Sequence, residues 1–540
     1  RAGGPDAKRF PTTELVPGGY ITSACSPLIY TADLFPEAYR GNNFVCDPAN
    51  NLVHREILVG KGAVFSAKRV DENTEFLRST DNWFRPVHLS IGPDGAVYVL
   101  DFYREVIETP LSLPDDIKAR LNLESRGRGR IWRIAPDGFK PGNLPDVSRS
   151  TAAQLADELL PANPARRLTA QRLLVERRPS GAPANLRARV PRAVGKGGYA
   201  NLLWTLHTLG DLTSDDVLPA LDDPQAGMRE QAIRLGETFF SAAADLRGRV
   251  ARLAADPEPR VRFQLALSAG SLPPGEAAAV LAAILEHDAD PWTQTAALSS
   301  ASGCVAPLID ALATKPDTAP VLSRLAAMTG ARGREAEIVR LLDRVAEGAN
   351  PAADAALLDG LGQGMRNSTR PLSLWWANPP TGARETMARL RGRFDAASKM
   401  VQDEKASSPA RVAAAGLLAF GPFDVAGPAL TPTLGPTASG DVQLAAVRTL
   451  AAHTDPKVPD LLLAPWGGYG PAARREVVEA LLARPDRTLK LLDAVEKKQV
   501  SANELDLARV RALKTHPTAA VRAKAEAVLK GAVNADRAKV

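Results

Sequence analysis

Cysteine is scarce in this chain of 540 residues, which has only Cys25, Cys46 and Cys304. Three cysteines cannot make the disulfide framework of a small secreted domain. No Cys-x-x-Cys-His motif occurs, so we expect no covalent haem in this chain. Cys25 and Cys46 are the candidate disulfide, and a bridge between them would indicate an oxidising compartment. The alternative is that both are small, buried, reduced side chains.

Long apolar runs and concentrated charge are also missing. No run approaches the roughly 20 residues that a membrane-spanning helix needs, so we expect no transmembrane segment. The chain has six histidines, and no His, Asp and Glu cluster stands at ligand spacing, so we expect no metal site. Lys and Arg number 67 against 61 Asp and Glu. This excess is too dilute for a nucleic-acid binder, so we expect no nucleic-acid partner.

Aromatic residues are few and unevenly placed. They make up 5% of the chain, and 15 of the 28 lie in residues 1–140. The chain therefore divides into an aromatic-rich head and a body rich in Ala, Leu and Arg. Because the chain begins at Arg1 without an apolar signal region, we expect that an upstream part is missing.

The head has the pattern of short β-strands separated by turns. The sequence GPDG at 92–95, between two stretches of alternating apolar residues, predicts a β-hairpin. Strands of this length, in groups about 40 residues apart, are typical of β-propeller blades. Strands are predicted at 44–46, 52–59, 64–70, 87–91, 96–102 and 129–134.

The head is too short for a closed propeller. It has room for about two to three blades, whereas propellers close with four to eight. We therefore expect a partial β-propeller, the C-terminal blades of a longer protein. The string RGRGR at 126–130 is interpreted as a turn between two structured elements rather than as an RNA-binding motif.

From about residue 150 the apolar pattern becomes helical and repeats. Asp223-Pro224 recurs 33 residues later as Asp256-Pro257, and we expect a third copy at Asp288. An Asp-Pro start followed by an Ala/Leu-rich helix is what a HEAT repeat looks like, because proline has its φ preset for the first helical position. Each helix pair buries its apolar face only against its neighbours, so the predicted architecture is an α-solenoid.

Several stretches of the head carry a resemblance to a known family. They are 22–27 (TSACSP), 41–48 (GNNFVCDP), 51–55 (NLVHR), 84–88 (FRPVH), 92–108 (GPDGAVYVLDFYREVIE) and 110–116 (PLSLPDD). Together they resemble the membrane-bound dehydrogenase family of planctomycetes and verrucomicrobia. The resemblance implies a propeller related to glucose/sorbosone dehydrogenases, joined to HEAT repeats and often to a C-terminal c-type cytochrome. It also implies a periplasmic or extracytoplasmic location, including association with a membrane, and pyrroloquinoline quinone as a cofactor.

The same resemblance directs attention to four head residues. Quinoprotein sugar dehydrogenases use a His base and basic side chains that hold the acidic quinone. On this basis His88 and Asp101 are the catalytic candidates, and Arg85 and Arg104 the cofactor-binding candidates. The alternatives are that His88 is an ordinary polar residue of a strand and that Asp101 is a structural hydrogen-bond acceptor. Further candidates are His54, Arg55, Tyr103 and Glu105.

Two segments interrupt the helical pattern. Residues 178–198 are basic and rich in Gly and Pro, which favours an exposed loop. Trp375-Trp376 lies in a predicted loop insertion, where the pair either contacts a partner or glycan or folds back over the solenoid. The predicted organisation is propeller blades at 1–140, linker and first helical repeat at 141–200, HEAT-like repeats at 201–362, loop insertion at 363–388, HEAT-like repeats at 389–532 and a tail at 533–540.

The resemblance implies the C-terminal portion of a periplasmic quinoprotein-like sugar or alcohol dehydrogenase, inactive by itself. Its solenoid would dock a protein partner, either a cytochrome or a membrane complex. The alternative is a non-catalytic propeller–solenoid scaffold that binds protein or carbohydrate. A basic solenoid for nucleic acid is disfavoured by the dilute charge.

Overall fold

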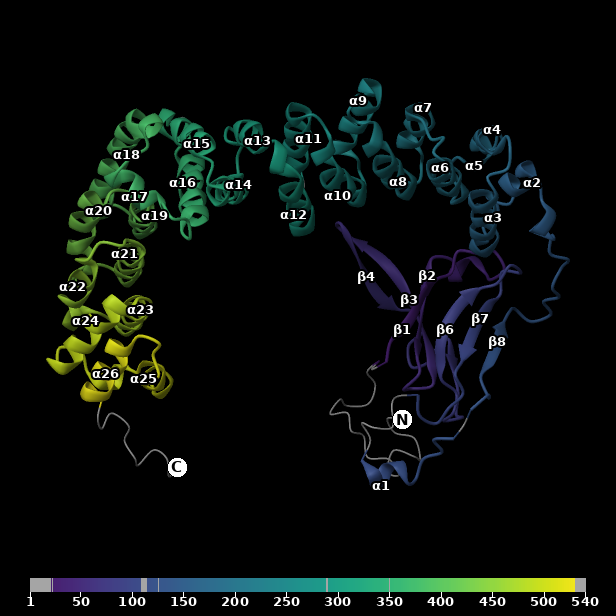
Figure 1. Ribbon diagram of the computed structural model, residues 1–540, viewed down its shortest axis with the longest axis horizontal. Helices are drawn as coiled ribbons and strands as arrows, with labels where there is room; N and C mark the ends of the chain where they lie inside the picture. Colours follow the sequence, from purple (N-terminus) through teal and green to yellow (C-terminus); the bar gives the residue numbers. More distant parts are fainter. Residues whose placement is uncertain are drawn as a thin grey trace. The chain divides into compact units, whose positions relative to one another are not determined.

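The computed structural model describes residues 21, 23–107, 114–124, 126–287, 290–348 and 350–529. Within them, two small antiparallel sheets are followed by a long helical region, which is consistent with a helical solenoid (Figure 1). The chain divides into two compact units, Arg1–Cys304 and Val305–Val540, which are described one at a time. Unit 1 holds both sheets and the first helices, and unit 2 is helical throughout its described residues.

The two sheets of unit 1 are built from strands that follow one another in sequence. The first has the order β1-β2-β3-β4, with β5 paired to β3, and the second has the order β6-β7-β8. These strands confirm the stretches predicted from alternation. The strands are β1 (Cys25–Ile29), β2 (Asn42–Asp47), β3 (Leu52–Lys61), β4 (Val64–Arg69), β5 (Leu77–Arg78), β6 (Pro86–Ile91), β7 (Val97–Asp101) and β8 (Arg130–Ile134).

One apolar core joins the two sheets. Side chains from both sheets bury together, among them Phe44 on β2, Leu89 on β6 and Val99 on β7. The predicted hairpin at 92–95 is confirmed: Gly95 has φ +85, a conformation that favours glycine, and its N–H donates to the Gly92 carbonyl. Tyr30 extends this core to the hairpin, because its hydroxyl donates to the Gly95 carbonyl at 2.9 Å.

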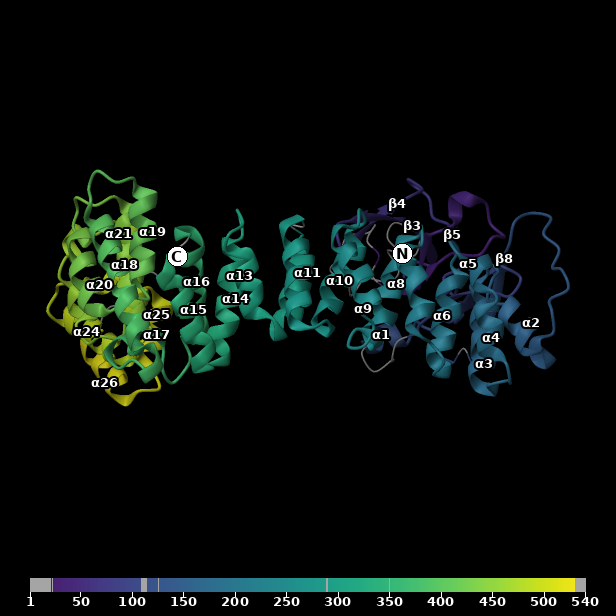
Figure 2. The same cartoon turned by 90° about the horizontal axis from the view of Figure 1, so that it is seen from above.

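The helices of unit 1 stack in two rows. In Figure 1, α3, α8, α10 and α12 lie in the row nearer the strands, and Figure 2 shows the helices following one another in chain order. A short helix of the head, α1 (Asp115–Lys118), precedes the two rows. The helices of the rows are α2 (Ala152–Asp157), α3 (Pro164–Arg177), α4 (Ala182–Arg187), α5 (Val190–Ala193), α6 (Gly198–Leu209), α7 (Ser214–Val217), α8 (Ala226–Gly236), α9 (Ala244–Arg252), α10 (Pro259–Ser268), α11 (Pro274–His287) and α12 (Pro291–Ser300).

In four of the repeats seen in the sequence, an arginine closes the turn before the helix. Arg229 donates to the carbonyls of Asp223 and Pro224, six and five residues earlier. Arg262 does the same to Asp256 and Pro257. These bonds satisfy carbonyls in the turn before a helix, where backbone groups lack helical partners. The same offsets recur at Arg167 with Pro161 and Ala162, and at Arg522 with His516 and Pro517.

The helices of unit 2 also form two rows, with α16, α19, α21 and α23 in one and α18, α20, α22 and α24 in the other (Figure 1). The helices are α13 (Val305–Leu312), α14 (Ala319–Arg332), α15 (Glu335–Glu347), α16 (Pro351–Met365), α17 (Leu372–Ala377), α18 (Arg384–Gln402), α19 (Ser408–Leu418), α20 (Phe423–Leu430), α21 (Gly440–Ala452), α22 (Val458–Leu463), α23 (Pro471–Leu482), α24 (Pro485–Glu496), α25 (Leu507–Lys514) and α26 (Ala519–Val528).

Glycines let α14 and α16 approach each other closely. A Cβ on Gly360 would lie 1.8 Å from the Ser323 carbonyl oxygen, and one on Gly364 would lie 2.1 Å from that of Ala327. A real Cβ cannot come so close, so only glycine fits at these two positions. The helix tolerates the cost of interior glycines because the close contact compensates for it.

Both predicted interruptions of the helical pattern are wrong in part. Residues 178–198 contain α4 and α5 rather than one exposed loop, and 363–388 contain α17 and the start of α18. Proline stands at the first turn of α4 and α5, where its missing N–H costs no helical bond. The side chain of Trp375 is buried, and the indole of Trp376 donates to the Phe420 carbonyl at 2.6 Å, so both pack against the helices.

Two other expectations concern residues outside the described part of the chain. Asp288 lies outside the described residues, and the aspartate that caps a helix here is Asp290, at the start of α12. The predicted tail 533–540 also lies outside the described residues. Asp290 has a further partner in the head, because its Oδ2 accepts the N–H of Ala63 at 3.0 Å.

Candidate functional site: the head strands and two grooves

Asp101 and Arg85 have structural hydrogen bonds that occupy their side chains. Oδ1 of Asp101 accepts the N–H of Arg85 at 2.8 Å and that of Tyr103 at 2.9 Å, and Oδ2 accepts the indole of Trp132 at 3.1 Å. The guanidinium of Arg85 donates to the carbonyls of Pro48, Arg104 and Glu105. Both side chains are buried. Asp101 thus has the role of structural acceptor that was the alternative to catalysis.

His88 lies on the other face of the sheet from Asp101. It pairs with Leu100 in the β6–β7 ladder, one position from Asp101, and successive side chains of a strand point to opposite faces. His88 is exposed, and its Nδ1 lies 3.1 Å from Oγ of Ser26. Ser26 has φ +50 and also accepts the N–H of Leu89. The structure therefore does not bring the two catalytic candidates together.

Cys25 and Cys46 face each other across β1 and β2 as free thiols. Burial raises the pKa of the Cys46 thiol to about 12, with Cys25 as a second cause. Burial, and then the charge of Asp47, raise the pKa of the Cys25 thiol. The sequence correctly singled out two neighbours, and the disulfide between them stays a prediction.

Arg104 lines a groove of about 440 Å³ on the outer face of the β6–β8 sheet. The floor of this groove, called here the head groove, is apolar. Val87 on β6, Leu100 on β7, Ile131 on β8 and the neighbouring Phe102 form this apolar floor. Asp101, whose carboxylate accepts three N–H groups, also lines the groove. Phe102 and Ile131 have exposed fractions of 44% and 70%, which is unusual for such large apolar side chains.

Three arginines stand at the head groove, each against an aromatic ring. The guanidinium of Arg104 lies 5.1 Å from the ring centre of Phe102, that of Arg128 lies 5.9 Å from Trp83, and that of Arg130 lies 3.4 Å from Tyr103. Such stacking orients a guanidinium without neutralising it. In the described part of the chain, no acidic side chain pairs with Arg128 or Arg130.

Sequence reasoning missed the importance of 126–130 because a short Gly-Arg string has no periodicity. The signal that was available is the alternation of arginine with glycine immediately before a strand. The other head candidates have partners within the fold. Nδ1 of His54 lies 2.6 Å from the Glu75 carboxylate, and Arg55 pairs with Asp71.

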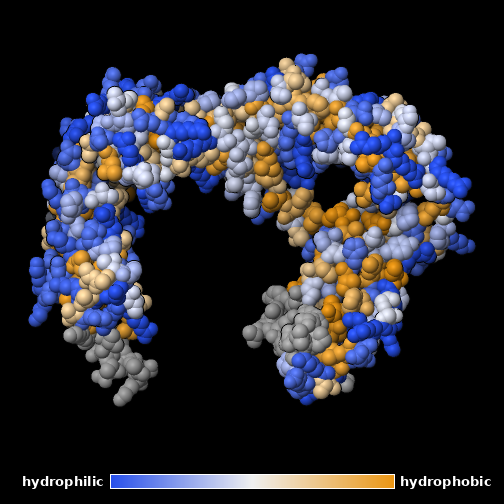
Figure 3. Space-filling view, in the orientation of Figure 1, coloured by the Kyte–Doolittle hydropathy of each residue, from blue (hydrophilic) through white to orange (hydrophobic). Residues whose placement is uncertain are grey.

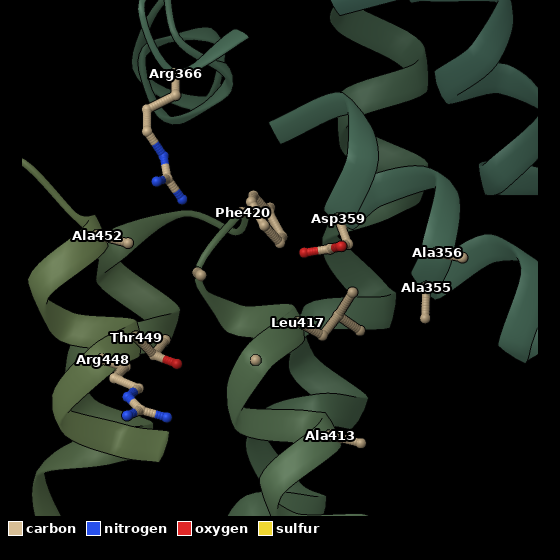
Figure 4. Close-up of a pocket in the computed structure, with 12 residues that line it drawn as sticks. Ala355, Ala356, Asp359, Arg366, Ala413, Leu417, Phe420, Arg448, Thr449 and Ala452 are labelled. Atoms are coloured by element: carbon tan, nitrogen blue, oxygen red, sulfur yellow. The ribbon is translucent and has the colours of Figure 1, made fainter. Parts of the chain in front are cut away.

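A second groove, of about 430 Å³, crosses three helices of one row in unit 2. It is called here the helical groove. Small residues keep it open, and Figure 4 shows Asp359, Phe420 and Arg366 directed toward the space between the helices. The lining comes from α16 (Ala355, Ala356, Asp359), α19 and the residues that follow it (Ala413, Gly416, Leu417, Ala419, Phe420), α21 (Arg448, Thr449, Ala452) and the turn after α16 (Arg366).

The charges of the helical groove differ in how they are satisfied. Arg448 forms a two-bond ion pair with Glu476 on α23, at 3.0 and 3.2 Å. Asp359 accepts from Gln363 at 2.7 Å and from Ser323 at 3.2 Å. Arg366 is exposed, and among the described residues no acidic side chain pairs with it. The groove thus offers an apolar floor, the Arg366 guanidinium and the Asp359 carboxylate, which bonds to neutral side chains.

Neither groove has the composition of a metal site. Among the residues that the structure describes, no three His, Cys, Asp or Glu side chains gather as metal ligands would. In the same residues, no helix combines the length and apolarity that crossing a membrane requires.

Comparison with protein families finds a match over the head. Residues 6–138 match a family described as a domain of unknown function (DUF7133). The match covers less than half of the chain and names no activity, so the resemblance to membrane-bound dehydrogenases stays a prediction. No curated protein matches the chain.

Among solved structures, one similar chain comes from the crystal structure of Kap121p. It is 11% identical, with a TM-score of 0.30 over 70% of this chain and 53% of that one. The matched part therefore spans about half the length of that protein. At this TM-score the likeness supports no argument about fold or function.

Proposed function

We propose that this chain is a non-catalytic scaffold whose helical groove binds a segment of a partner protein. The observation that carries the proposal is the groove itself, a hollow of about 430 Å³ across α16, α19 and α21. Extended arrays of helix pairs commonly use such surfaces to bind other polypeptides. Leu417 and Phe420 offer an apolar contact, and Arg366 offers a charge for an acidic side chain.

We infer in addition that the helical region consists of HEAT-like repeats. An arginine that donates to the carbonyls five and six residues before it recurs in these repeats. This supports the inference, because structural repeats share the same local hydrogen bonds. We also infer that the two sheets of the head are blades of a β-propeller. In support, each sheet is a meander of consecutive antiparallel strands.

Of the two arginines proposed to hold the quinone, Arg85 fits poorly, because its guanidinium donates to three backbone carbonyls. The catalytic candidate Asp101 already accepts three N–H groups through its carboxylate. We therefore assign no reaction step to these residues. Dehydrogenase activity and an extracytoplasmic location stay predictions, and quinone-dependent dye reduction with sugars and alcohols would test the first.

The scaffold proposal is tested by photo-crosslinking in the native host. A photoreactive amino acid replaces Ala413 or Gly416 in the helical groove; both are exposed, and a Cβ on Gly416 would meet nothing within 4 Å. The matched control position is Lys399, exposed on α18, which does not line the groove. We expect one protein to be captured from both groove positions and not from Lys399.

The captured protein is then purified and its binding measured directly. We expect Arg366→Glu to weaken binding by about tenfold or more, because it turns a charge-assisted contact into a repulsion. Reversing the charge at exposed Arg475 on α23 should leave binding unchanged. The proposal would be overturned if the protein were captured equally from Lys399, or if Arg366→Glu left the affinity for it unchanged.

A further inference from the structure

Among the described strands, β8 lies at one edge of the β6–β8 sheet. Within the described strands it pairs only with β7, and its residues from Arg130 to Arg133 are all exposed. The exposed fractions are 70% for Ile131 and 45% for Trp132. An edge strand with large apolar residues is a template for pairing with another strand, which proteins usually avoid unless the edge is used.

The head groove lies directly beside this edge. Its floor runs across the sheet from Val87 on β6 through Leu100 on β7 to Ile131 on β8. Figure 3 shows hydrophobic surface over the part of the head where Figure 1 places β6 and β7. A strand added next to β8 would place every second side chain on this same face, next to Ile131.

The charges at this edge favour an acidic partner. Arg128 stands two residues before β8 and Arg130 is its first residue, and in the described residues neither has a carboxylate partner. Arg130 is stacked on Tyr103, which the Asp101 carboxylate holds in place through its N–H. The Arg130 guanidinium is thus fixed before a ligand arrives, which lowers the entropy cost of binding.

We propose that an extended segment of a partner protein, with alternating apolar and acidic residues, binds as a strand beside β8. Its main chain pairs with the free edge of β8, and its apolar side chains cover Ile131 and the groove floor. Its carboxylates pair with Arg128 and Arg130. This surface belongs to unit 1, so it is independent of the helical groove, and the two proposals can fail separately.

A polypeptide explains more of this surface than a nucleic acid does. A nucleic acid would use the arginines but would leave the edge N–H and C=O groups and the aliphatic floor without partners. An extended peptide uses all three features. Binding through one short strand is expected to be of the weak, transient class.

The test uses the full chain and a fluorescein-labelled peptide of about ten residues that alternates valine with glutamate. Binding is followed by fluorescence anisotropy. We expect Arg128→Glu to weaken binding by about tenfold, the scale of one lost charge-assisted bond. Ile131→Glu should weaken it similarly, because it removes floor contact and repels the acidic peptide. The control is the variant Arg475→Glu, because Arg475 is exposed in unit 2, away from the head groove. This variant should bind the peptide as tightly as the unchanged chain does.

Three other probes separate the explanations. A peptide with lysine in place of glutamate, and one with proline at alternate positions, should both bind at least about tenfold more weakly, because they remove the charge match and the main-chain donors respectively. Single-stranded DNA should bind more weakly than the acidic peptide. If DNA binds as tightly, or if the proline peptide binds like the original, the edge is not a strand-binding site and the proposal is overturned. Arg128→Glu and Ile131→Glu both change exposed side chains. Thermal unfolding like that of the unchanged chain confirms that the two variants fold.

Discussion

The indole N–H of Trp132 donates a hydrogen bond to Oδ2 of Asp101, 3.1 Å away across β8 and β7. The same carboxylate accepts the N–H groups of Arg85 and Tyr103 through Oδ1. Asp101 therefore links three parts of the head: the start of β6, Tyr103, on which Arg130 stacks, and the strand β8. One buried carboxylate organises the end of the sheet that carries the head groove.

Asp101→Asn should destabilise the head by about 1–3 kcal/mol, since an amide has one acceptor oxygen and presents N–H where an N–H already points. The free energy of unfolding is measured in urea by tryptophan fluorescence. Asp137→Asn, at an exposed position, is the control and should change stability by less than about 0.5 kcal/mol. Equal effects of the two substitutions would show that the Asp101 bonds do not stabilise the head.

In the reduced, folded protein, Cys46 should resist alkylation at pH 8. With a pKa raised to about 12, only about one thiol in ten thousand is the reactive thiolate at that pH. Cys25, whose pKa is also raised, should react more slowly than a free cysteine. Mass spectrometry after brief iodoacetamide treatment follows each site. Unfolding in urea is the control, in which both sites should react quickly; rapid labelling of folded Cys46 would contradict the structure.

The same mass measurement tests the disulfide. Protein isolated from its native compartment without reductant is alkylated in urea before and after reduction. If Cys25 and Cys46 become reactive only after reduction, the bridge exists in the cell. If both react beforehand, the pair is reduced there, and the expectation of an oxidising compartment loses its support.

Gly364→Ala should destabilise unit 2 by about 1–3 kcal/mol or more, because the new Cβ overlaps the Ala327 carbonyl and forces α14 and α16 apart. Gly392→Ala is the matched control. Gly392 lies inside α18, and a Cβ there would meet nothing within 4 Å. Alanine should stabilise that helix by about 0.5–1 kcal/mol. Thermal and urea unfolding compare the two variants, and a shift of the same sign in both would refute the close-packing argument.

Unit 2 should lose stability as the pH falls below about 6.5, the ordinary pKa of histidine. Burial lowers the pKa of His453, whose Nε2 bonds the Leu418 carbonyl at 3.0 Å; Asp455 and Arg487 act on it in opposite directions. Below about 6.5 the unfolded chain therefore binds a proton that the folded chain does not, which favours unfolding. Above that pH the contribution is fully present.

The His453 contribution is isolated by comparing unfolding between pH 5 and pH 7.5 in the native chain and in His453→Gln. Glutamine keeps an N–H for the Leu418 carbonyl but does not titrate, so the variant should show a shallower loss of stability at low pH. His516, which is not buried, is the control position, and His516→Gln should retain the full pH dependence. Identical slopes in the native chain and His453→Gln would contradict this assignment.

Local patterns predicted most of the head strands and the start of the helical repeats. Alternation between Val97 and Asp101 and the GPDG turn sufficed for the hairpin, because strand and turn conformations depend on neighbouring residues. The Asp-Pro repeats were visible for the same reason. The segments predicted as loops were harder to assign from sequence. Gly and Pro in α4 and near α17 favoured loops, whereas tertiary packing stabilises helices there.

The sequence by itself determined an aromatic β-head, a helical body and the neighbouring cysteines. Only the tertiary structure decided what the polar residues of the head do. The strand period of two put His88 and Asp101 on opposite faces, and the burial of Arg85 and Asp101 required hydrogen bonds that occupy them. Residues far apart in the chain had to come together before Arg128, Arg130 and Ile131 could be recognised as one exposed edge. Contacts between distant residues have no local pattern, and for that reason the candidate sites emerged only from the fold.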